Sequence, residues 1–99
     1  MVSNIIFHPE AAEELDQAII WYEEQQADLG RFFFDEYLAL RDEIVANPQH
    51  FAFTFEDIRR ANFPRFPYFI VFSVEEDALF IYGIMHQKRN PKAWQERVK

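Results

Sequence analysis

The chain has 99 residues, a formal net charge of −7, 49% hydrophobic residues and no cysteine. This length predicts a single domain over residues 1–99, and the lack of thiols excludes disulfides and thiolate metal sites, as expected of a cytoplasmic protein. No stretch approaches the roughly 20 consecutive apolar residues that span a membrane, and the first residues lack the cationic start of a signal peptide, so no membrane association is expected.

The first half of the chain is predicted to form one strand and two helices. Val2 to Phe7 is rich in β-branched and aromatic residues, which favours a short strand. Pro9 suits the first turn of a helix, and apolar residues then recur at helical spacing to about residue 27. Asp28 is expected to cap a second helix that ends at Asn47-Pro48. Because so few residues join the two helices, they are expected to run antiparallel.

The second half of the chain is predicted to form antiparallel strands after an aromatic-rich connector that ends at Phe55. A short helix is expected to close the chain. In chain order, the expected elements are strands over residues 58–63, 66–74 and 79–86, with a hairpin turn over 75–78, and a helix over 91–98.

The middle strand of this sheet is apolar on both faces. Alternation places Phe69 and Val71 on one face and Tyr68, Ile70, Phe72 and Val74 on the other. One of these faces is expected to pack against the helical hairpin. The second face either forms a groove for a partner or is covered by the connector and the terminal helix.

The residues that follow the last expected strand are rich in cations. Residues 1–57 hold thirteen acidic and two basic side chains, whereas residues 58–99 hold four acidic and eight basic ones. Because charges are screened over about 8 to 10 Å at physiological salt, a cationic rim from the C-terminal half can persist apart from an anionic hairpin. The pattern favours a phosphate-facing surface. Its residues are His86, Lys88, Arg89, Asn90, Pro91 and Trp94.

Structural interpretations of the same residues remain open. A histidine such as His86 is more often bonded to the backbone than catalytic, and Trp94 suits a packing anchor for the last helix. Arg89 is either a functional cation or part of a solvated chain end. Three further cations either contact a target or protect edge strands from aggregation. They are Arg59, Arg60 and Arg65.

The sequence predicts neither a metal site nor a cofactor. His8, His50 and His86 are far apart, and no helical His or Glu spacing near them matches a metal-binding motif. The two isolated glycines, Gly30 and Gly83, exclude a glycine-rich phosphate loop.

Four features follow one another over nearly the whole chain: residues 7–15 as a strand leading into a helix, the helical hairpin, Phe66-Pro67-Tyr68 opening a central strand, and His86, Arg89, Pro91 and Trp94 at the close. In their order and spacing, the chain resembles the RelE/ParE superfamily of bacterial type II toxins, the family named for plasmid stabilisation. The resemblance implies an α+β domain in which an N-terminal strand and an antiparallel helical hairpin pack on an antiparallel sheet of about four strands, followed by a short C-terminal helix.

The superfamily has one branch known for cutting messenger RNA on the ribosome and another known for poisoning DNA gyrase. Cutting RNA needs a proton acceptor, cations and a proton donor, and the resemblance implies Arg89, Lys88 and His86 as candidates. However, a gapless register puts Phe69 where the RNA-cutting branch carries a phosphate-binding arginine. Arg65 lies about 13 Å away along an extended strand and is no obvious substitute. This departure weakens the RNA-cutting alternative, whereas the Phe66-Pro67-Tyr68 opening and the pattern from His86 to Trp94 look more like the ParE side.

We therefore expect a ParE-like toxin that inhibits DNA gyrase by binding rather than turnover. The resemblance also implies neutralisation by a cognate antitoxin. A disordered segment of it could fold across the apolar outer sheet and helix surfaces in a hetero-oligomer, and a homodimer is open as well. The alternatives are a RelE-like ribosome-dependent endoribonuclease and a non-toxic binding scaffold or co-repressor. The expected antitoxin contacts are Phe69, Val71 and Trp94. The expected target contacts are Arg59, Arg60, Arg65, Lys88, Arg89 and Lys92.

Overall fold

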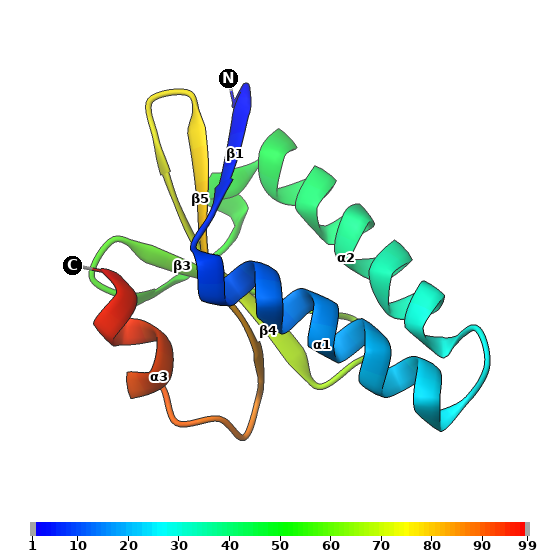
Figure 1. The fold of residues 1–99 in the computed structure, drawn as a ribbon. Coiled ribbons are helices and arrows are strands. Elements are labelled where there is room, and N and C mark those ends of the chain that lie inside the picture. The colour runs from blue at the N-terminus through cyan, green and yellow to red at the C-terminus, as the bar shows by residue number, and fades with distance from the viewer. Residues whose placement is uncertain (1, 99) are drawn as a thin grey trace.

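A helical hairpin and a short C-terminal helix lie on opposite faces of a five-stranded sheet in the computed structural model, which describes residues 2–98 (Figure 1). The hairpin consists of α1 (Pro9–Gln25) and α2 (Leu29–Ala46). The strands are β1 (Asn4–Phe7), β2 (Phe53–Phe55), β3 (Ile58–Asn62), β4 (Tyr68–Glu75) and β5 (Ala78–His86). The chain closes with α3 (Lys92–Gln95) and a 3₁₀ turn over Glu96–Val98. This is the expected α+β arrangement.

The sheet has the strand order β1-β5-β4-β3-β2, and it differs from the expected sheet in two details. First, β1 pairs with β5 in parallel, whereas the other pairs are antiparallel, so the sheet is mixed. Second, the connector supplies a fifth strand, β2, which pairs with β3 with a register shift. Three residues are too few for alternation to be recognised in the sequence, and Glu56, at φ 51°, turns the chain directly into β3.

The two helices of the hairpin are capped by side chains of α1 and of the residue before it. His8 Nδ1 accepts the backbone N–H of Glu10 at the start of α1. The expected cap of α2 by Asp28 is wrong: Asp28 has φ 72° and its side chain makes no capping hydrogen bond. Instead, the carboxylate of Glu23 accepts the backbone N–H groups of Asp28 and Gly30, each at 3.0 Å. A side chain from the end of α1 therefore accepts the hydrogen bonds of backbone N–H groups that have no helical partner at the start of α2.

The sheet has one apolar core on each face. Ile70 and Phe72 of β4 pack under the hairpin with Phe33 and Ile44 of α2. On the outer face, Phe69 and Val71 belong to a second, smaller core. The predicted division of β4 into two apolar faces is thus confirmed. None of the helices within residues 2–98 is both long and apolar enough to cross a membrane.

Candidate functional site

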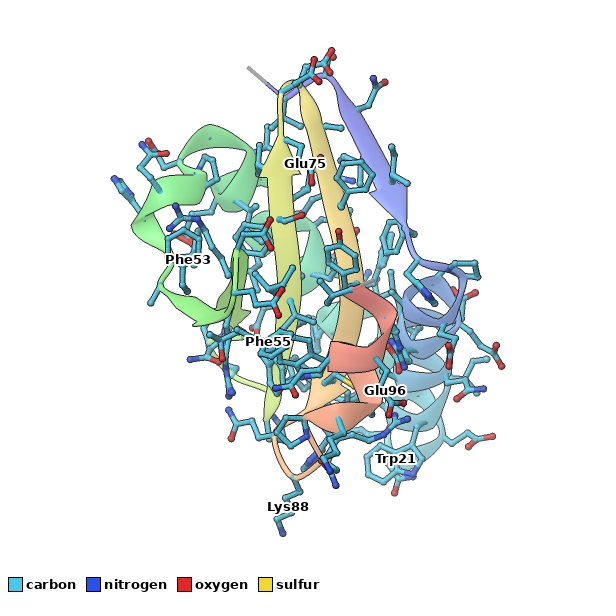
Figure 2. All side chains as sticks on the ribbon, turned by 90° about the vertical axis from the view of Figure 1, so that its left-hand side faces the viewer. Trp21, Phe53, Phe55, Glu75, Lys88 and Glu96 are labelled. Atoms are coloured by element: carbon cyan, nitrogen blue, oxygen red, sulfur yellow. The ribbon has the colours of Figure 1, made fainter. Side chains whose placement is uncertain are left out.

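The C-terminal segment, residues 87–98, turns back from the end of β5 and lies against the outer face of the sheet (Figure 2). The turn is fixed by backbone contacts: Gln87 donates to the carbonyl of Pro67, and Arg89 donates to the carbonyl of His86. Asn90 Oδ1 then accepts the backbone N–H of Lys92 at 2.9 Å, which stabilises the start of α3. The Asn-Pro pair thus supplies the local start signal for this helix.

Trp94 anchors the segment in the second core. Its side chain is buried together with Phe69, Val71, Met85 and Ile58. The ring of Phe55 packs edge-on against the Trp94 ring, with 5.8 Å between the ring centres. Of the two interpretations of the outer face, the structure therefore shows the one in which the connector and the terminal helix cover it. The three expected antitoxin contacts, Phe69, Val71 and Trp94, are enclosed, and a partner would reach Phe69 and Val71 only after the C-terminal segment had moved away.

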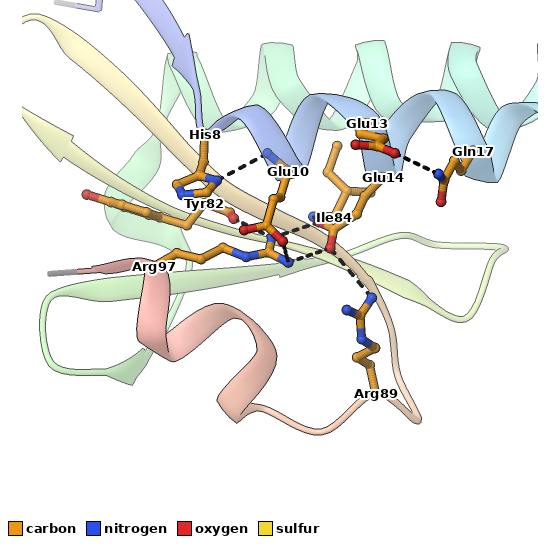
Figure 3. Close-up of polar contacts among 9 residues, drawn as sticks. All are labelled: His8, Glu10, Glu13, Glu14, Gln17, Tyr82, Ile84, Arg89 and Arg97. Carbon is orange, nitrogen blue, oxygen red and sulfur yellow. Dashed lines mark hydrogen bonds and ion pairs between the residues drawn. The ribbon is translucent and has the colours of Figure 1, made fainter.

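A buried ion pair ties the C-terminal segment to α1 (Figure 3). Arg97 donates from Nη1 and Nη2 to the carboxylate of Glu14 at 3.0 and 2.7 Å, and from Nη1 to the carbonyl of Tyr82. Glu14 also accepts the backbone N–H of Ile84 in β5. The Arg97 side chain is only 5% exposed, and its hydrogen bonds to Glu14 raise the pKa of the guanidinium.

Arg97 was not a candidate from the sequence, and its role there is hard to recognise. It lies 83 residues from Glu14, so no local spacing connects the two. Glu14 itself is one of many acidic residues of the first helix, and nothing in its local sequence sets it apart. The one available signal is that a glutamate close to the apolar stripe of an amphipathic helix is placed to be partly buried.

Arg89 was expected to lie apart from the anionic hairpin, but it contacts the hairpin. Its Nη1 lies 3.5 Å from the same Glu14 carboxylate, and its side chain is 51% exposed (Figure 3). Arg65 also contacts the hairpin, because its Nε and its backbone N–H both donate to the carboxylate of Glu36 in α2. The turn and the β3–β4 loop both reach the hairpin, so part of the cationic half is paired with the acidic half.

Lys88 and Lys92 remain open to a partner. Both side chains are exposed, Lys88 at the tip of the turn after β5 (Figure 2). Within residues 2–98 neither lysine forms an ion pair. Together with the half-exposed Arg89, they form the cationic rim, a name we keep for Lys88, Arg89 and Lys92.

Arg60 lies on the outer face with the C-terminal segment, whereas Arg59 lies at the β2 edge. The Arg60 guanidinium is 3.8 Å from the centre of the Phe69 ring, and its Nε donates to Asn62. Arg59 lies over the ring of Phe53 and donates to the carbonyl of Phe51. A cation from the neighbouring strand therefore covers the Phe69 ring.

His86 is engaged with the backbone. Its Nδ1 accepts the N–H of Lys88 at 3.1 Å, and its ring meets that of Tyr68 edge-on at 5.2 Å. This is the structural interpretation that the sequence favoured, and it leaves Nε2 as the nitrogen available to a substrate or partner. Within the described residues, no three His, Asp or Glu side chains are arranged to hold a metal ion.

The chain matches one family by sequence and one described solved structure by fold. Residues 5–91 match the family described as the ParE toxin of the type II toxin–antitoxin system, parDE. Among solved structures, the chain is similar to one described as the chromosomal ParDE toxin–antitoxin system from P. aeruginosa, with a TM-score of 0.63 and 14% sequence identity. That match covers 86% of this chain and 96% of the other. No curated protein sequence matches the chain.

Proposed function

Because the family match covers residues 5–91, the chain belongs to the ParE toxin family of type II toxin–antitoxin systems, and we propose that it inhibits DNA gyrase by binding and is neutralised by a cognate antitoxin. The observation that carries the binding mechanism is the cationic rim of Lys88, Arg89 and Lys92. The rim stands on a segment that is fixed by the buried Trp94 and by the ion pair between Arg97 and Glu14. Such a surface favours docking to an anionic partner.

The gyrase proposal is tested by DNA supercoiling with purified gyrase. We expect the wild-type chain to block supercoiling, and the double variant Lys88→Ala and Lys92→Ala to block it about tenfold less efficiently, because exposed charges act on association. Arg31→Ala is the matched control, since it removes an exposed cation from α2, away from the rim. Full supercoiling in the presence of the wild-type chain would refute gyrase as the target.

The endoribonuclease alternative is supported by one specific contact. The Arg60 guanidinium over the Phe69 ring supplies a cation on the face that also carries the C-terminal segment. Cleavage by a 2′-hydroxyl requires such a charge beside the phosphate. Toeprinting on translating ribosomes decides between the two functions: codon-phased cuts that disappear in Arg60→Ala and Arg89→Ala would favour the enzyme, and intact messages would favour the binder.

A further inference from the structure

The free edge of β1 is apolar and carries no charge. β1 is the first strand in the order β1-β5-β4-β3-β2, so only one of its two edges is paired within residues 2–98, and it forms a margin of the sheet (Figure 2). Ile5 and Ile6 are 40% and 46% exposed. Residues 2–7 contain no charged side chain and no proline. Edge strands are ordinarily protected by such residues, so this edge is open to pairing with another strand.

The backbone of β1 turns two residues toward the free edge. The N–H of His8, directly after the strand, donates to the carbonyl of Ile81 in β5 at 2.9 Å. Because alternate residues of a strand direct their N–H and C=O groups to the same side, Ile6 also faces β5, whereas Ile5 and Phe7 face the free edge. A strand that pairs with both of these residues would form four backbone hydrogen bonds with them.

A second copy of the same strand fits this edge. In an antiparallel pair with a two-fold axis at Ile6, perpendicular to the sheet, Ile5 of each copy is opposite Phe7 of the other. Both residues present the backbone groups that this register uses. Ile6 is then opposite Ile6 of the other copy on the outer face, while Ile5 and Phe7 meet on the hairpin face. An apolar side chain is therefore opposite an apolar side chain at every position of the pair.

The opposite edge of the sheet does not offer an equivalent strand. β2 has three residues, and its pairing with β3 contains a register shift. The guanidinium of Arg59 lies over the Phe53 ring, 3.9 Å from its centre, so a cation stands at this edge. A bulge and a charge both hinder the addition of a strand. Pairing of β1 with β2 of another copy would also leave a free edge at each end, whereas pairing of β1 with β1 closes as a dimer.

We propose that β1 of one copy pairs with β1 of a second copy and joins their two five-stranded sheets into one continuous sheet. The added strand supplies main-chain hydrogen bonds, and the isoleucines supply the apolar contact. The paired segment is short, so the dimer dissociates on dilution. Because the two-fold axis is perpendicular to the sheet, both outer faces lie on the same side, and the dimer carries two cationic rims on that side.

The charge of the chain determines how such a dimer responds to salt. Each copy has a net charge of −7, so two copies repel each other, although the paired strands themselves are uncharged. Salt screens this repulsion and leaves the backbone hydrogen bonds and the apolar contacts in place, so the dimer becomes more stable. Contact between the cationic rim of one copy and the acidic hairpin of another would instead weaken with salt. The sign of the salt dependence therefore distinguishes the two modes of association.

Sedimentation equilibrium of the purified chain from about 5 to about 300 µM measures the dimer Kd. We expect the Kd to fall severalfold between about 0.1 and about 0.5 M NaCl. Ile6→Lys places two like charges opposite each other, and its Kd should rise at least about tenfold. Phe53→Lys is the matched control, because it makes the same change at a residue 58% exposed on β2, and its Kd should equal that of the wild type. Thermal unfolding by circular dichroism verifies that both variants are folded.

Disulfide trapping tests the register, because the chain has no cysteine of its own. In Ile6→Cys the two thiols belong to directly opposite residues with Cα atoms about 4.5 Å apart, within reach of a disulfide, so mild oxidation should give a covalent dimer. Ile5→Cys sets the thiols about 7 to 8 Å apart, which is too far, and should remain uncrosslinked. Ile20→Cys, equally exposed on α1, controls for random collision.

Four results would overturn the proposal. The first is a chain that stays monomeric at every concentration, which would leave the edge of β1 to a partner of another kind. The second is a dimer that weakens as salt is added. The third is an equal loss of association in Ile6→Lys and Phe53→Lys. The fourth is crosslinking of Ile5→Cys or Ile20→Cys to the extent seen in Ile6→Cys.

Discussion

At the scale of single residues, the carboxylate of Glu14 holds three parts of the molecule together. It accepts hydrogen bonds from Arg97 in the C-terminal segment and from the backbone N–H of Ile84 in β5, and it belongs to α1. Arg97 is nearly buried, so its charge depends on Glu14 for compensation. The position of the cationic rim therefore depends on one acidic side chain of the hairpin.

We predict that Glu14→Gln lowers the free energy of unfolding by about 3 kcal/mol, because it leaves the buried guanidinium of Arg97 with only the more distant and exposed carboxylate of Glu10, at 3.6 Å, as a counter-charge. Urea unfolding followed by circular dichroism measures the change. Glu13→Gln is the matched control on the same helix. The Glu13 carboxylate accepts only an exposed hydrogen bond from Gln17, so its loss should change the free energy by less than about 0.5 kcal/mol. Equal effects of the two substitutions would contradict a structural role for the ion pair.

Residue roles were predictable from the sequence only where they depend on near neighbours. His86 was expected to bond to the backbone, and it accepts the N–H of Lys88 two residues on. The partners of Arg65 and Arg97 were not predictable, because Glu36 and Glu14 lie 29 and 83 residues away. Asp28 shows that a local pattern can also mislead: it stands where a cap is expected, yet Glu23 supplies the contacts.

At the scale of elements, α3 is too short to be stable by itself. It spans four residues, Lys92–Gln95, and a helix of this length gains almost nothing from its own hydrogen bonds. Trp94, packed against Phe69 and Val71, supplies the burial that holds it in place. The position of α3 on the sheet thus depends on the burial of one indole ring and on the contacts of the adjacent Arg97 with Glu14 and Tyr82.

We predict that Trp94→Ala releases the C-terminal segment while the hairpin core stays folded. Loss of a buried tryptophan costs about 3 to 5 kcal/mol, which exceeds what the remaining contacts of so short a helix can offset. Hydrogen exchange should show faster exchange of the amides of residues 92–98, with slow exchange retained in β4 and α2. Lys92→Ala, an exposed position of the same helix, is the control. Unchanged protection of residues 92–98 in Trp94→Ala would refute the anchoring role.

Most elements followed from periodicity and turn residues, and the exceptions have physical causes. The hairpin, β4 and β5 are long enough for their apolar pattern to be unambiguous. The strand β2 has three residues, so its pairing with β3 depends on tertiary contacts rather than on its own pattern. The parallel pairing of β1 depends on where the chain returns after the hairpin, which composition does not specify.

At the scale of the whole molecule, basic side chains from the second half of the chain form ion pairs with acidic side chains of the helical hairpin. Arg65 pairs with Glu36, and Arg89 and Arg97 both meet Glu14. The hairpin lies across one face of the sheet, so its acidic side chains come within reach of the loop before β4 and of the segment after β5. The expected separation of an anionic hairpin from a cationic rim therefore holds for Lys88 and Lys92 and fails for these three arginines.

The whole fold should lose stability at alkaline pH through three tyrosines, of which Tyr37 is buried and Tyr22 and Tyr68 are partly buried. Burial raises the pKa of Tyr22, Tyr37 and Tyr68 above the ordinary value of 10.0, so the folded state keeps these protons up to a higher pH than the unfolded state does. Their contribution is complete below pH 10 and is lost as the pH rises through the folded-state pKa values. Urea unfolding from about pH 8 to about pH 11 should show a smaller decline in Tyr68→Phe than in the wild type, with similar free energies near neutrality. Parallel curves for the two proteins would show that ionisation of Tyr68 does not oppose folding.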